Sequence, residues 1–388
     1  MRTPILLRFQ STFRLVCGFL ILFTAAAASF SGFYEKWHFR EAMPEYQTNL
    51  PSTGPKLGGV SLSLGVMLNG TASRPYVYRQ LLPTIANSID SVLPASVKEA
   101  LYSFRTPSGK FLRERFFISP MARSHEYFVR YFIIYFSTFA FAILSTCGMF
   151  FFARSQGFNS TQSIAASTVM ILLLPVFMSV GGYYYDYAEL AFLVAAVLIA
   201  LRLHWALLIP LAALAAWNKE SFLLFVPCFY PLLRSRFSRW QAIVATGASG
   251  LAAGLVVAAL RSHFAGNSGG SVEFHLAEQI SYLLNPAKMI VPGDSTYGII
   301  SLPSLNPFTL AIILFLVWDG WSQLSLELRR FTGVAALINL PLFFLFCAPG
   351  ELRDLSFLYL SFMLLIAVQL KKADQPNGGS LTHDLAHS

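Results

Sequence analysis

Charged and polar residues interrupt or flank the apolar runs of this chain, and these residues are the ones that could do chemistry. The clearest case is the stretch 218–221, where Lys219 and Glu220 follow Asn218 inside a run otherwise fit for lipid. A charge at the bilayer centre costs about 3 kcal/mol on insertion scales, so such residues normally face protein, a cavity or water. Lys219 could bind a phosphate while Glu220 orients it or a second basic residue. The alternative is an ion pair or a helix cap.

Acidic residues also stand at the boundaries of two other apolar runs. Asp186 and Glu189 are three residues apart in YYYDYAEL, so they share one face of a helix. With Tyr185 they would form the aromatic, hydrogen-bonding wall that is typical of sugar sites, although acids in a first turn also complement the helix dipole. In PGELRDL, proline and glycine break the helix, which lets Glu351 and Arg353 line a cavity. Arg353 is a candidate phosphate ligand.

Two further motifs lie nearer the N-terminus. In RPYVYRQLLP, Arg74 and Arg79 bracket two tyrosines, and a guanidinium fork matches phosphate oxygens. We expect Arg74, Tyr78 and Arg79 to bind substrate, the alternative being surface charges on an amphipathic helix. In FYEKWHFRE, Glu35 directly follows the first apolar run. A carboxylate held at that depth suits a general base, whereas the alternative is an ordinary interfacial aromatic belt with flanking charges.

The composition shows what must position these residues. The chain has 388 residues, of which 55% are hydrophobic and 12% are charged, whereas about 25% charge is usual in soluble domains. Repeated apolar runs of about 20 residues predict an all-α polytopic membrane protein. We expect about ten transmembrane helices, at 13–33, 128–152, 162–181, 184–203, 205–217, 221–233, 240–261, 307–323, 331–347 and 355–370.

Loop charges predict how the short helices 205–217 and 221–233 are arranged. Each is too short to cross about 30 Å of hydrocarbon alone at 1.5 Å per residue. If they form a hairpin with its tip at 218–221, every short basic cluster falls on one side of the membrane, as the positive-inside rule expects. One continuous span would cancel that bias. The hairpin is therefore favoured, with both termini cytoplasmic and the motifs above on the outer face.

The same topology divides the rest of the chain. Residues 1–370 form one integral membrane domain with two extracytoplasmic loops, 34–127 and 262–306, and 371–388 form a disordered cytoplasmic tail. In the first loop, apolar residues from Leu81 to Leu93 share one helical face, and those from Val97 to Phe104 share another. These stretches predict amphipathic helices lying on the membrane surface.

The sequence excludes some classes of function and contains no motif for others. The net charge of +9 comes from basic residues at the ends of apolar segments, so we expect membrane lipids as partners and no nucleic acid. The four cysteines lack CxxC spacing and are expected in the core. No His/Cys/Asp cluster has metal spacing, so we expect no cofactor, and a divalent cation would have no evident set of ligands. The cytoplasmic loops are too short to bind a nucleotide.

Taken together, the motifs resemble the GT-C superfamily of polytopic glycosyltransferases, and RPYVYRQLLP, WNKESFLL and GELRDLSFLYLSFMLL are the stretches most similar to it. The resemblance implies inverting transfer of a sugar from a polyprenyl-phosphate carrier to an extracytoplasmic acceptor. It implies Glu35 as the base, although the superfamily more often has Asp there, and Arg79, Lys219 and Arg353 as ligands of the lipid phosphate.

Other functions stay open at this stage. One is an envelope-polysaccharide polymerase or ligase that uses a diphosphate-linked donor. Another is a transporter or flippase of lipid-linked sugars, since broken, charged helices are typical of transporters. The short loops suggest a bacterial inner membrane. The sugar, the acceptor and the oligomeric state are not indicated by the sequence.

Overall fold

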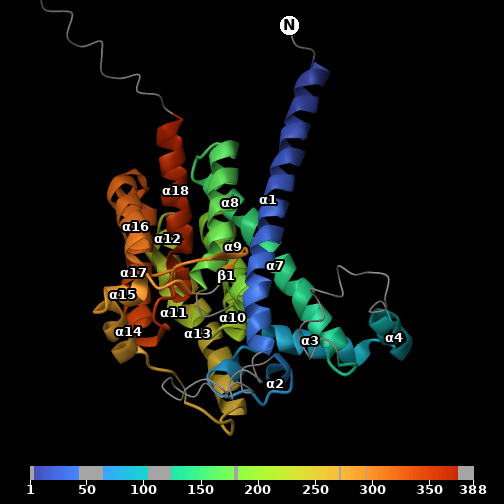
Figure 1. The fold of residues 1–388 in the computed structure, drawn as a ribbon. Coiled ribbons are helices and arrows are strands. Elements are labelled where there is room, and N and C mark those ends of the chain that lie inside the picture. The colour runs from blue at the N-terminus through green and yellow to red at the C-terminus, as the bar shows by residue number, and fades with distance from the viewer. Residues whose placement is uncertain are drawn as a thin grey trace, which may run out of the picture.

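The computed structural model is built almost entirely of helices (Figure 1). It describes residues 4–42, 64–103, 124–178, 182–270, 272–293 and 295–374, with no side chains described for 4–12, 14–15, 35–36 and 38–42. The long helices are α1 (Pro4–Ala42), α7 (Phe128–Ser155), α8 (Ser160–Phe177), α9 (Asp186–Arg202), α10 (Leu208–Asn218), α13 (Arg239–His263), α16 (Pro307–Gly320), α17 (Leu326–Phe346) and α18 (Tyr359–Ala373).

Further elements, most of them short, connect these helices. They are α2 (Leu64–Leu68), η2 (Tyr76–Tyr78), α3 (Leu81–Val92), α4 (Ala95–Ser103), η3 (Trp205–Leu207), α11 (Phe222–Phe225), η4 (Val226–Cys228), α12 (Phe229–Arg234), α14 (Leu276–Leu283), α15 (Pro286–Met289), η5 (Trp321–Gln323) and η6 (Arg353–Leu358). One hairpin of two short strands, β1 (Ser295–Thr296) and β2 (Ile299–Ile300), follows α15.

The expected class, an all-α membrane protein, agrees with these helices. Among the described residues, six helices are long and apolar enough to cross a membrane: Val16–Tyr34 within α1, then α7, α8, α13, α17 and the run Arg353–Ala373. Helices are also present at the other four predicted places, but they are shorter. These are α9 with 17 residues, α16 with 14 residues, and the two pieces Trp205–Asn218 and Phe222–Arg234.

The first helix is longer than expected. It continues from the predicted end at residue 33 to Ala42, so residues 34–42 belong to α1 and not to the loop 34–127. Nothing in that stretch is a proline or a glycine, so no residue stops the helix. Tyr34 and Trp37 also hold it by packing on α7, where the Trp37 ring stacks on Tyr131 at 5.5 Å and the Tyr34 and Tyr131 hydroxyls are 2.9 Å apart.

The predicted hairpin of α10 and α11–α12 is confirmed by hydrogen bonds at both of its ends. Arg236, just after α12, donates to the carbonyl oxygens of Ala200 and Leu203 at 3.1 and 3.0 Å, so α12 ends beside the end of α9, from which the chain passes through η3 into α10. At the tip, the Asn218 amide donates to the carbonyl of Tyr185 at 3.1 Å. The chain therefore runs through α10 to the start of α9, turns at 218–221 and returns through α11 and α12 to the end of α9.

The ends of the helices define two sides of the molecule. The start of α1 and the end of α18 lie at the same end, which we call the terminal side, while the opposite end, which we call the loop side, carries α2, α3 and α14 (Figure 1). Polar contacts join elements at the terminal side, such as Lys372 to Asp319 at 2.7 Å and Gln162 to Asp374 at 2.8 Å. The basic residues in the last turns of α7, α9, α12 and α18 lie at this side, which agrees with the predicted grouping of loop charges.

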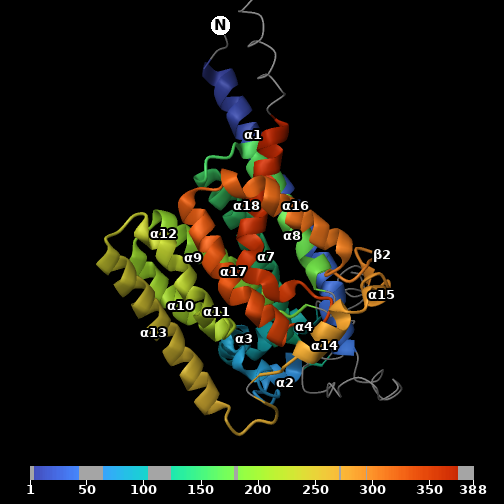
Figure 2. The same cartoon turned by 90° about the vertical axis from the view of Figure 1, so that its left-hand side faces the viewer.

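The helix α9 forms the centre of the bundle. Nearly all its residues from Asp186 to Ala200 are buried, as expected for a helix that is apolar around its whole circumference. Helices α7 and α8 with α1 lie on one side of it, α10, α12 and α13 on another, and α17 and α18 close the bundle (Figure 2). The first turn of α9, with its two acids, is thereby enclosed by segments distant in sequence.

The two amphipathic helices predicted in the first loop are present as α3 and α4. Their location on a membrane surface stays a prediction. Leu81 and Leu82 of α3 are buried, while Ile85, Ile89 and Val92 are exposed. Residues 104–123 and the tail from 375 lie outside the described part of the chain.

Candidate functional site

The site is built on two stacked tyrosines that precede α9. The rings of Tyr183 and Tyr185 lie 5.1 Å apart and nearly parallel, at 8°. Asp186, the first residue of α9, fixes this turn by accepting a hydrogen bond from the backbone N–H of Tyr183 at 2.8 Å. A Cβ at Gly182 would lie 2.3 Å from the ring of Phe33, so only glycine permits α1 to approach this closely. The two rings are held rigidly at the loop-side end of the central helix.

Arg79 covers one ring of this pair. Its guanidinium carbon lies 4.6 Å from the centre of the Tyr185 ring and 5.0 Å from that of Tyr76, and it donates to the Tyr185 hydroxyl. It also lies 3.4 Å from the Glu220 carboxylate. Burial disfavours the charged form, but Tyr185 and Glu220 outweigh burial and hold the pKa of Arg79 well above its ordinary value. The cation is therefore permanent.

Tyr76 joins the site as a second layer of aromatic surface. Its ring lies 5.9 Å from that of Tyr183, and its hydroxyl donates to the Glu273 carboxylate at 2.8 Å. Burial, helped by Tyr183 and Glu273, raises the pKa of the Tyr76 hydroxyl well above its ordinary value. The hydroxyl stays protonated and acts as a donor.

Lys219 enters from the hairpin tip, where α10 ends. Its ammonium lies 2.7 Å from the Glu189 carboxylate and 3.9 Å from that of Asp354. The second oxygen of Glu189 accepts from the Ser356 hydroxyl at 3.1 Å. Lys219 therefore pairs with acids from two other segments and not with its neighbour Glu220.

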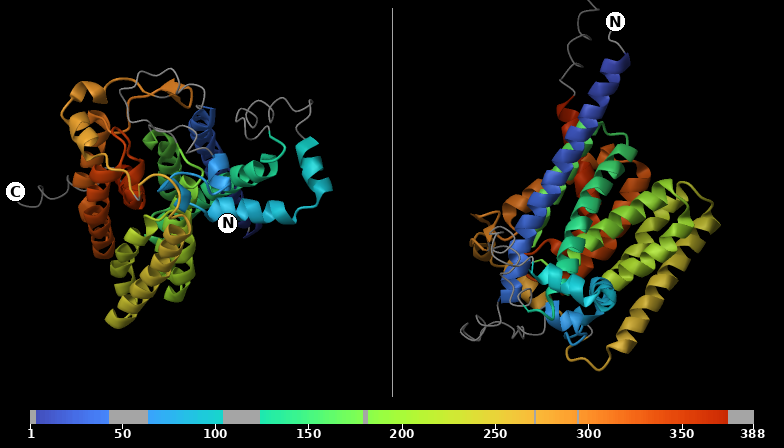
Figure 3. Two further views of the ribbon diagram at one scale, coloured as in Figure 1. Left: turned by 90° about the horizontal axis from the view of Figure 1, so that it is seen from below. Right: turned by 90° about the vertical axis from the view of Figure 1, so that its right-hand side faces the viewer.

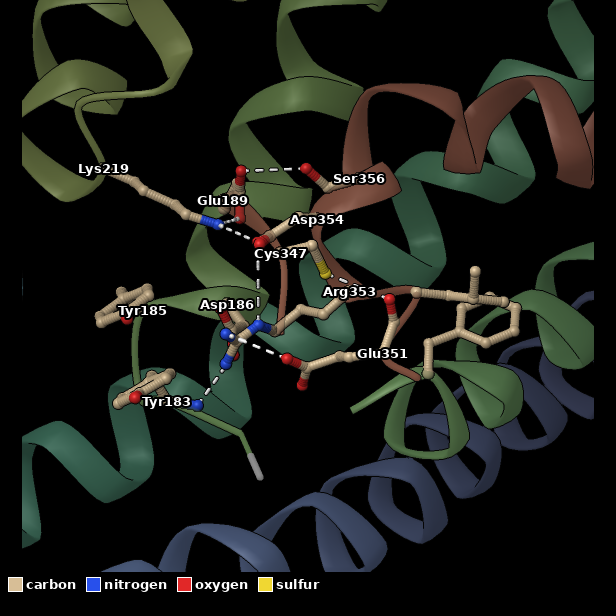
Figure 4. A network of polar contacts seen from close by, with 12 residues as sticks. Tyr183, Tyr185, Asp186, Glu189, Lys219, Cys347, Glu351, Arg353, Asp354 and Ser356 are labelled. Carbon is tan, nitrogen blue, oxygen red and sulfur yellow. Dashed lines mark hydrogen bonds and ion pairs between the residues drawn. The ribbon is translucent and has the colours of Figure 1, made fainter. Parts of the chain in front are cut away.

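Arg353 is the first residue of η6, which follows α17. Its guanidinium lies 4.9 Å from the centre of the Tyr183 ring, 3.4 Å from Glu351 and 4.0 Å from Asp186. The break predicted at PGELRDL is present, since α17 ends at Phe346 and Gly350 has a φ of +82°, which a residue with a Cβ rarely adopts. The turn at Gly350 brings both charged side chains back over the bundle (Figure 4).

These side chains form one contiguous group, which we call the loop-side cluster. Its ionisable members are Arg79, Asp186, Glu189, Lys219, Glu220, Glu351, Arg353 and Asp354. Within the described part of the chain it thus holds three cations and five carboxylates. Asp186, Glu189, Lys219 and Glu351 are each less than a tenth exposed. Buried atoms without a hydrogen-bond partner among the described residues include Asp186 Oδ1 and Glu220 Oε2.

The structure brings together eight of the eleven residues that the sequence singled out. Arg79, Tyr185, Asp186, Glu189, Lys219, Glu220, Glu351 and Arg353 all belong to the cluster or its aromatic wall. The remaining three are Glu35, Arg74 and Tyr78.

Arg74 and Tyr78 lie apart from the cluster. The backbone of Arg74 pairs with that of Gly269, and Tyr78 is buried with its ring 5.9 Å from the guanidinium of Arg261. The reason is the 3₁₀ turn at Tyr76–Tyr78, in which residues three apart point the same way. Tyr76, three residues before Arg79, therefore faces the cluster in place of Tyr78.

Glu35 has its backbone on α1, and its side chain lies outside the described part of the structure. Its neighbours show where this part of α1 runs. Trp37 lies 6.4 Å from the ring of Tyr184, and the Tyr184 hydroxyl donates to the backbone carbonyl of Arg79 at 2.9 Å. The assignment of Glu35 as a base stays a prediction.

Four contributors were not selected from the sequence: Tyr76, Tyr183, Asp354 and Ser356. Tyr76 could have been found from its spacing to Arg79 if the turn had been identified as 3₁₀. Asp354 follows Arg353 directly, but only the fold shows that it also reaches Lys219. Ser356 carries no charge or motif that points to Glu189.

Among the described residues no group of three or more His, Cys, Asp and Glu side chains is arranged to hold a metal ion. No protein-family model matches this chain, and neither a curated protein nor a solved structure does. The geometry of the site is therefore what any function must rest on.

An open cavity of about 370 Å³ lies next to the turn before Glu351. Its lining comes from α14, from α15 and from the stretch before Gly350. The lining residues are Ala277, Glu278, Ser281, Tyr282, Lys288 and Pro349.

Proposed function

We propose that this chain is a membrane glycosyltransferase of the GT-C type, which moves a sugar from a polyprenyl-phosphate carrier to an acceptor on the loop side. One observation carries the proposal. Arg79, Lys219 and Arg353, from three distant parts of the chain, meet around the stacked rings of Tyr183 and Tyr185. Ionisable groups whose pKa values are strongly shifted in such a setting are typical of functional sites.

The three cations suit a leaving phosphate. Guanidinium groups bind phosphate oxygens through two parallel hydrogen bonds, and fixed cations stabilise the negative charge that grows on a leaving group. Tyrosine rings with hydroxyl groups present both an apolar face and hydrogen bonds, which is what a sugar ring requires.

The excess of carboxylates sets a condition on binding. A phosphate adds negative charge to a group that already has more anions than cations, so it must replace a carboxylate partner of a cation. The pair of Arg79 and Glu220 is a candidate for this exchange, because Glu220 is the one carboxylate that pairs with Arg79 among the described residues and is partly exposed, at 18% of its side chain. Glu220 would hold Arg79 in place until the donor arrives.

The remaining roles follow from the side on which the cluster lies. The basic residues of the terminal side indicate a cytoplasmic location for both termini. The cluster would then lie on the extracytoplasmic side of a bacterial inner membrane. Glu35 would deprotonate the acceptor hydroxyl with inversion at the sugar, and the cavity beside Pro349 would admit the acceptor.

The test is a donor assay with the purified chain in lipid nanodiscs. Binding and transfer of a labelled sugar are measured from polyprenyl monophosphate and polyprenyl diphosphate donors, for the natural chain, Arg353→Gln and the control Arg130→Gln. Arg130 is a matched cation of the loop side that pairs with Asp90 outside the cluster. We expect transfer from the monophosphate donor, lost in Arg353→Gln and kept in the control.

Two outcomes would contradict the proposal. Transfer from the diphosphate donor alone would indicate a polymerase or ligase. Movement of an intact lipid-linked sugar across vesicles, with no transfer, would indicate a transporter.

A further inference from the structure

The helix α14 lies in the stretch 262–306, which was expected to be an extracytoplasmic loop. Its exposed face is apolar, which does not suit a helix that faces water. Leu276 and Ile280 of α14 and Leu284, the residue that follows the helix, are spaced four apart, form one stripe and are exposed at 41, 47 and 79%. The side chains that this helix buries are Gln279 and Tyr282. A surface helix in water buries its apolar stripe, so the outward face of α14 requires an apolar neighbour.

The same pattern continues along the chain beyond α14. More than half of each of four aliphatic side chains is exposed there, and these are Ile290, Val291, Ile299 and Ile300. The last two form strand β2, which pairs with β1 across a turn of two residues, Tyr297 and Gly298. Both have positive φ, +58° and +75°, as in a tight two-residue hairpin turn.

The turn of this hairpin contacts two candidate spans, α8 and α1, at positions before their loop-side ends. The Tyr297 hydroxyl donates to the carbonyl of Leu172 at 2.8 Å. Leu172 is five residues before the loop-side end of α8 at Phe177, which is about 7.5 Å along a helix. The Tyr297 ring also lies directly on Gly32 of α1, where a Cβ would be 2.6 Å from the ring.

The segment is fixed at its other end to α17. The backbone N–H of His275 donates to the carbonyl of Leu345 at 2.8 Å. Seen from below, the chain arcs from there to α1 (Figure 3). Backbone at membrane depth must have its hydrogen bonds satisfied, and the described contacts include the β1–β2 pairing and a bond from Gly293 to Ser301 at 2.8 Å.

From these contacts we infer that residues 275–293 and 295–300 form a re-entrant segment in the loop-side leaflet of the membrane, whose exposed aliphatic side chains contact lipid acyl chains. Helix α16, in which Phe308, Ile312 and Leu314 are also exposed, lies on the same side of the molecule as β2 and α15 (Figure 2). Lipid covers exposed apolar side chains of this kind in a single membrane protein, and no second chain is needed. The polar face of α14, with Glu278 and Ser281, turns instead to the open cavity.

The test uses cysteine probes, added one at a time to the natural chain, in liposomes. Leu284→Cys and Ile299→Cys are labelled with a nitrobenzoxadiazole maleimide, with Glu278→Cys as the matched control on the polar face of the same helix. The natural chain is labelled in parallel as the blank for its four cysteines. Ile280→Cys and Ile300→Cys replace either probe that does not fold.

We expect nitroxide groups attached near the top of the acyl chains to abolish most of the fluorescence at positions 284 and 299, while aqueous iodide leaves it unchanged. Position 278 should show the reverse. Quenching of 284 and 299 by iodide would overturn the inference. So would protection from both quenchers in liposomes that is lost in nanodiscs holding a single chain, since that result indicates an interface between two copies.

Discussion

The ammonium of Lys219 lies 2.7 Å from the carboxylate of Glu189, and this ion pair joins the hairpin tip to the first turn of α9. Both side chains are buried, with 9 and 5% exposed. The charge that interrupts the apolar run at 218–221 is thus neutralised by a carboxylate that lies within the bundle. The hairpin cannot slide along α9 without separating this pair.

Removing one partner of the pair should destabilise the fold strongly. Loss of one side of a buried ion pair costs about 3–5 kcal/mol, because the other charge stays buried. We expect Lys219→Met to lower the free energy of unfolding by about that amount, and the double change with Glu189→Leu to recover much of it. Thermal unfolding in detergent measures this. Lys372→Met, whose partner Asp319 lies at the surface, is the control, and an equal loss in that variant would contradict the prediction.

Removing the carboxylate that competes for Arg79 should strengthen donor binding. In Glu220→Gln the guanidinium keeps its place over Tyr185 but loses an anionic partner. We expect the affinity for a polyprenyl phosphate to rise about tenfold, the change that about 1.4 kcal/mol produces. Glu126→Gln, which removes an exposed partner of Arg130, is the control. Unchanged or weaker binding in Glu220→Gln would show that Arg79 does not exchange partners.

The fork of Arg353 should matter in addition to its charge. Hydrogen bonds to charged groups contribute about 1.5–3 kcal/mol each, so loss of the fork predicts donor affinity weaker by about 10- to 100-fold in Arg353→Lys. Arg130→Lys should bind as the natural chain does. Titration of the lipid in nanodiscs, with unfolding measured in parallel, separates a binding defect from a folding defect. Full affinity in Arg353→Lys would contradict bidentate binding.

The assignment of the base predicts a split between binding and transfer. Glu35→Gln keeps the size of the side chain but cannot accept a proton from the acceptor hydroxyl. We expect transfer to be abolished while donor binding stays unchanged. Full transfer activity in this variant would exclude Glu35 as the base.

The sequence predicted the helices well because apolar periodicity and charge decide where a membrane helix runs. The hairpin followed from loop charges, and Arg236 and Asn218 now show it directly. The end of α1 was missed because Tyr34 and Trp37 extend it by packing on α7, a contact that no local pattern encodes.

The pairing within the site could not be predicted. Lys219 and Glu220 are neighbours in sequence, yet they point to different partners, Glu189 and Arg79. The choice is made by the direction in which the hairpin tip meets α9 and η2. Asp354 and Ser356 enter for the same reason, because the turn at Gly350 sets which residues face the bundle.

The most direct test of the central claim is an experimental density map of the chain purified from its native membrane in nanodiscs, with mass spectrometry of the lipids that accompany it. We predict a polyprenyl phosphate whose phosphate lies between Arg79, Lys219 and Arg353 and near Glu35, with Glu220 moved away from Arg79. A cluster that keeps its described pairs while added polyprenyl phosphate binds elsewhere, or does not bind, would contradict the claim.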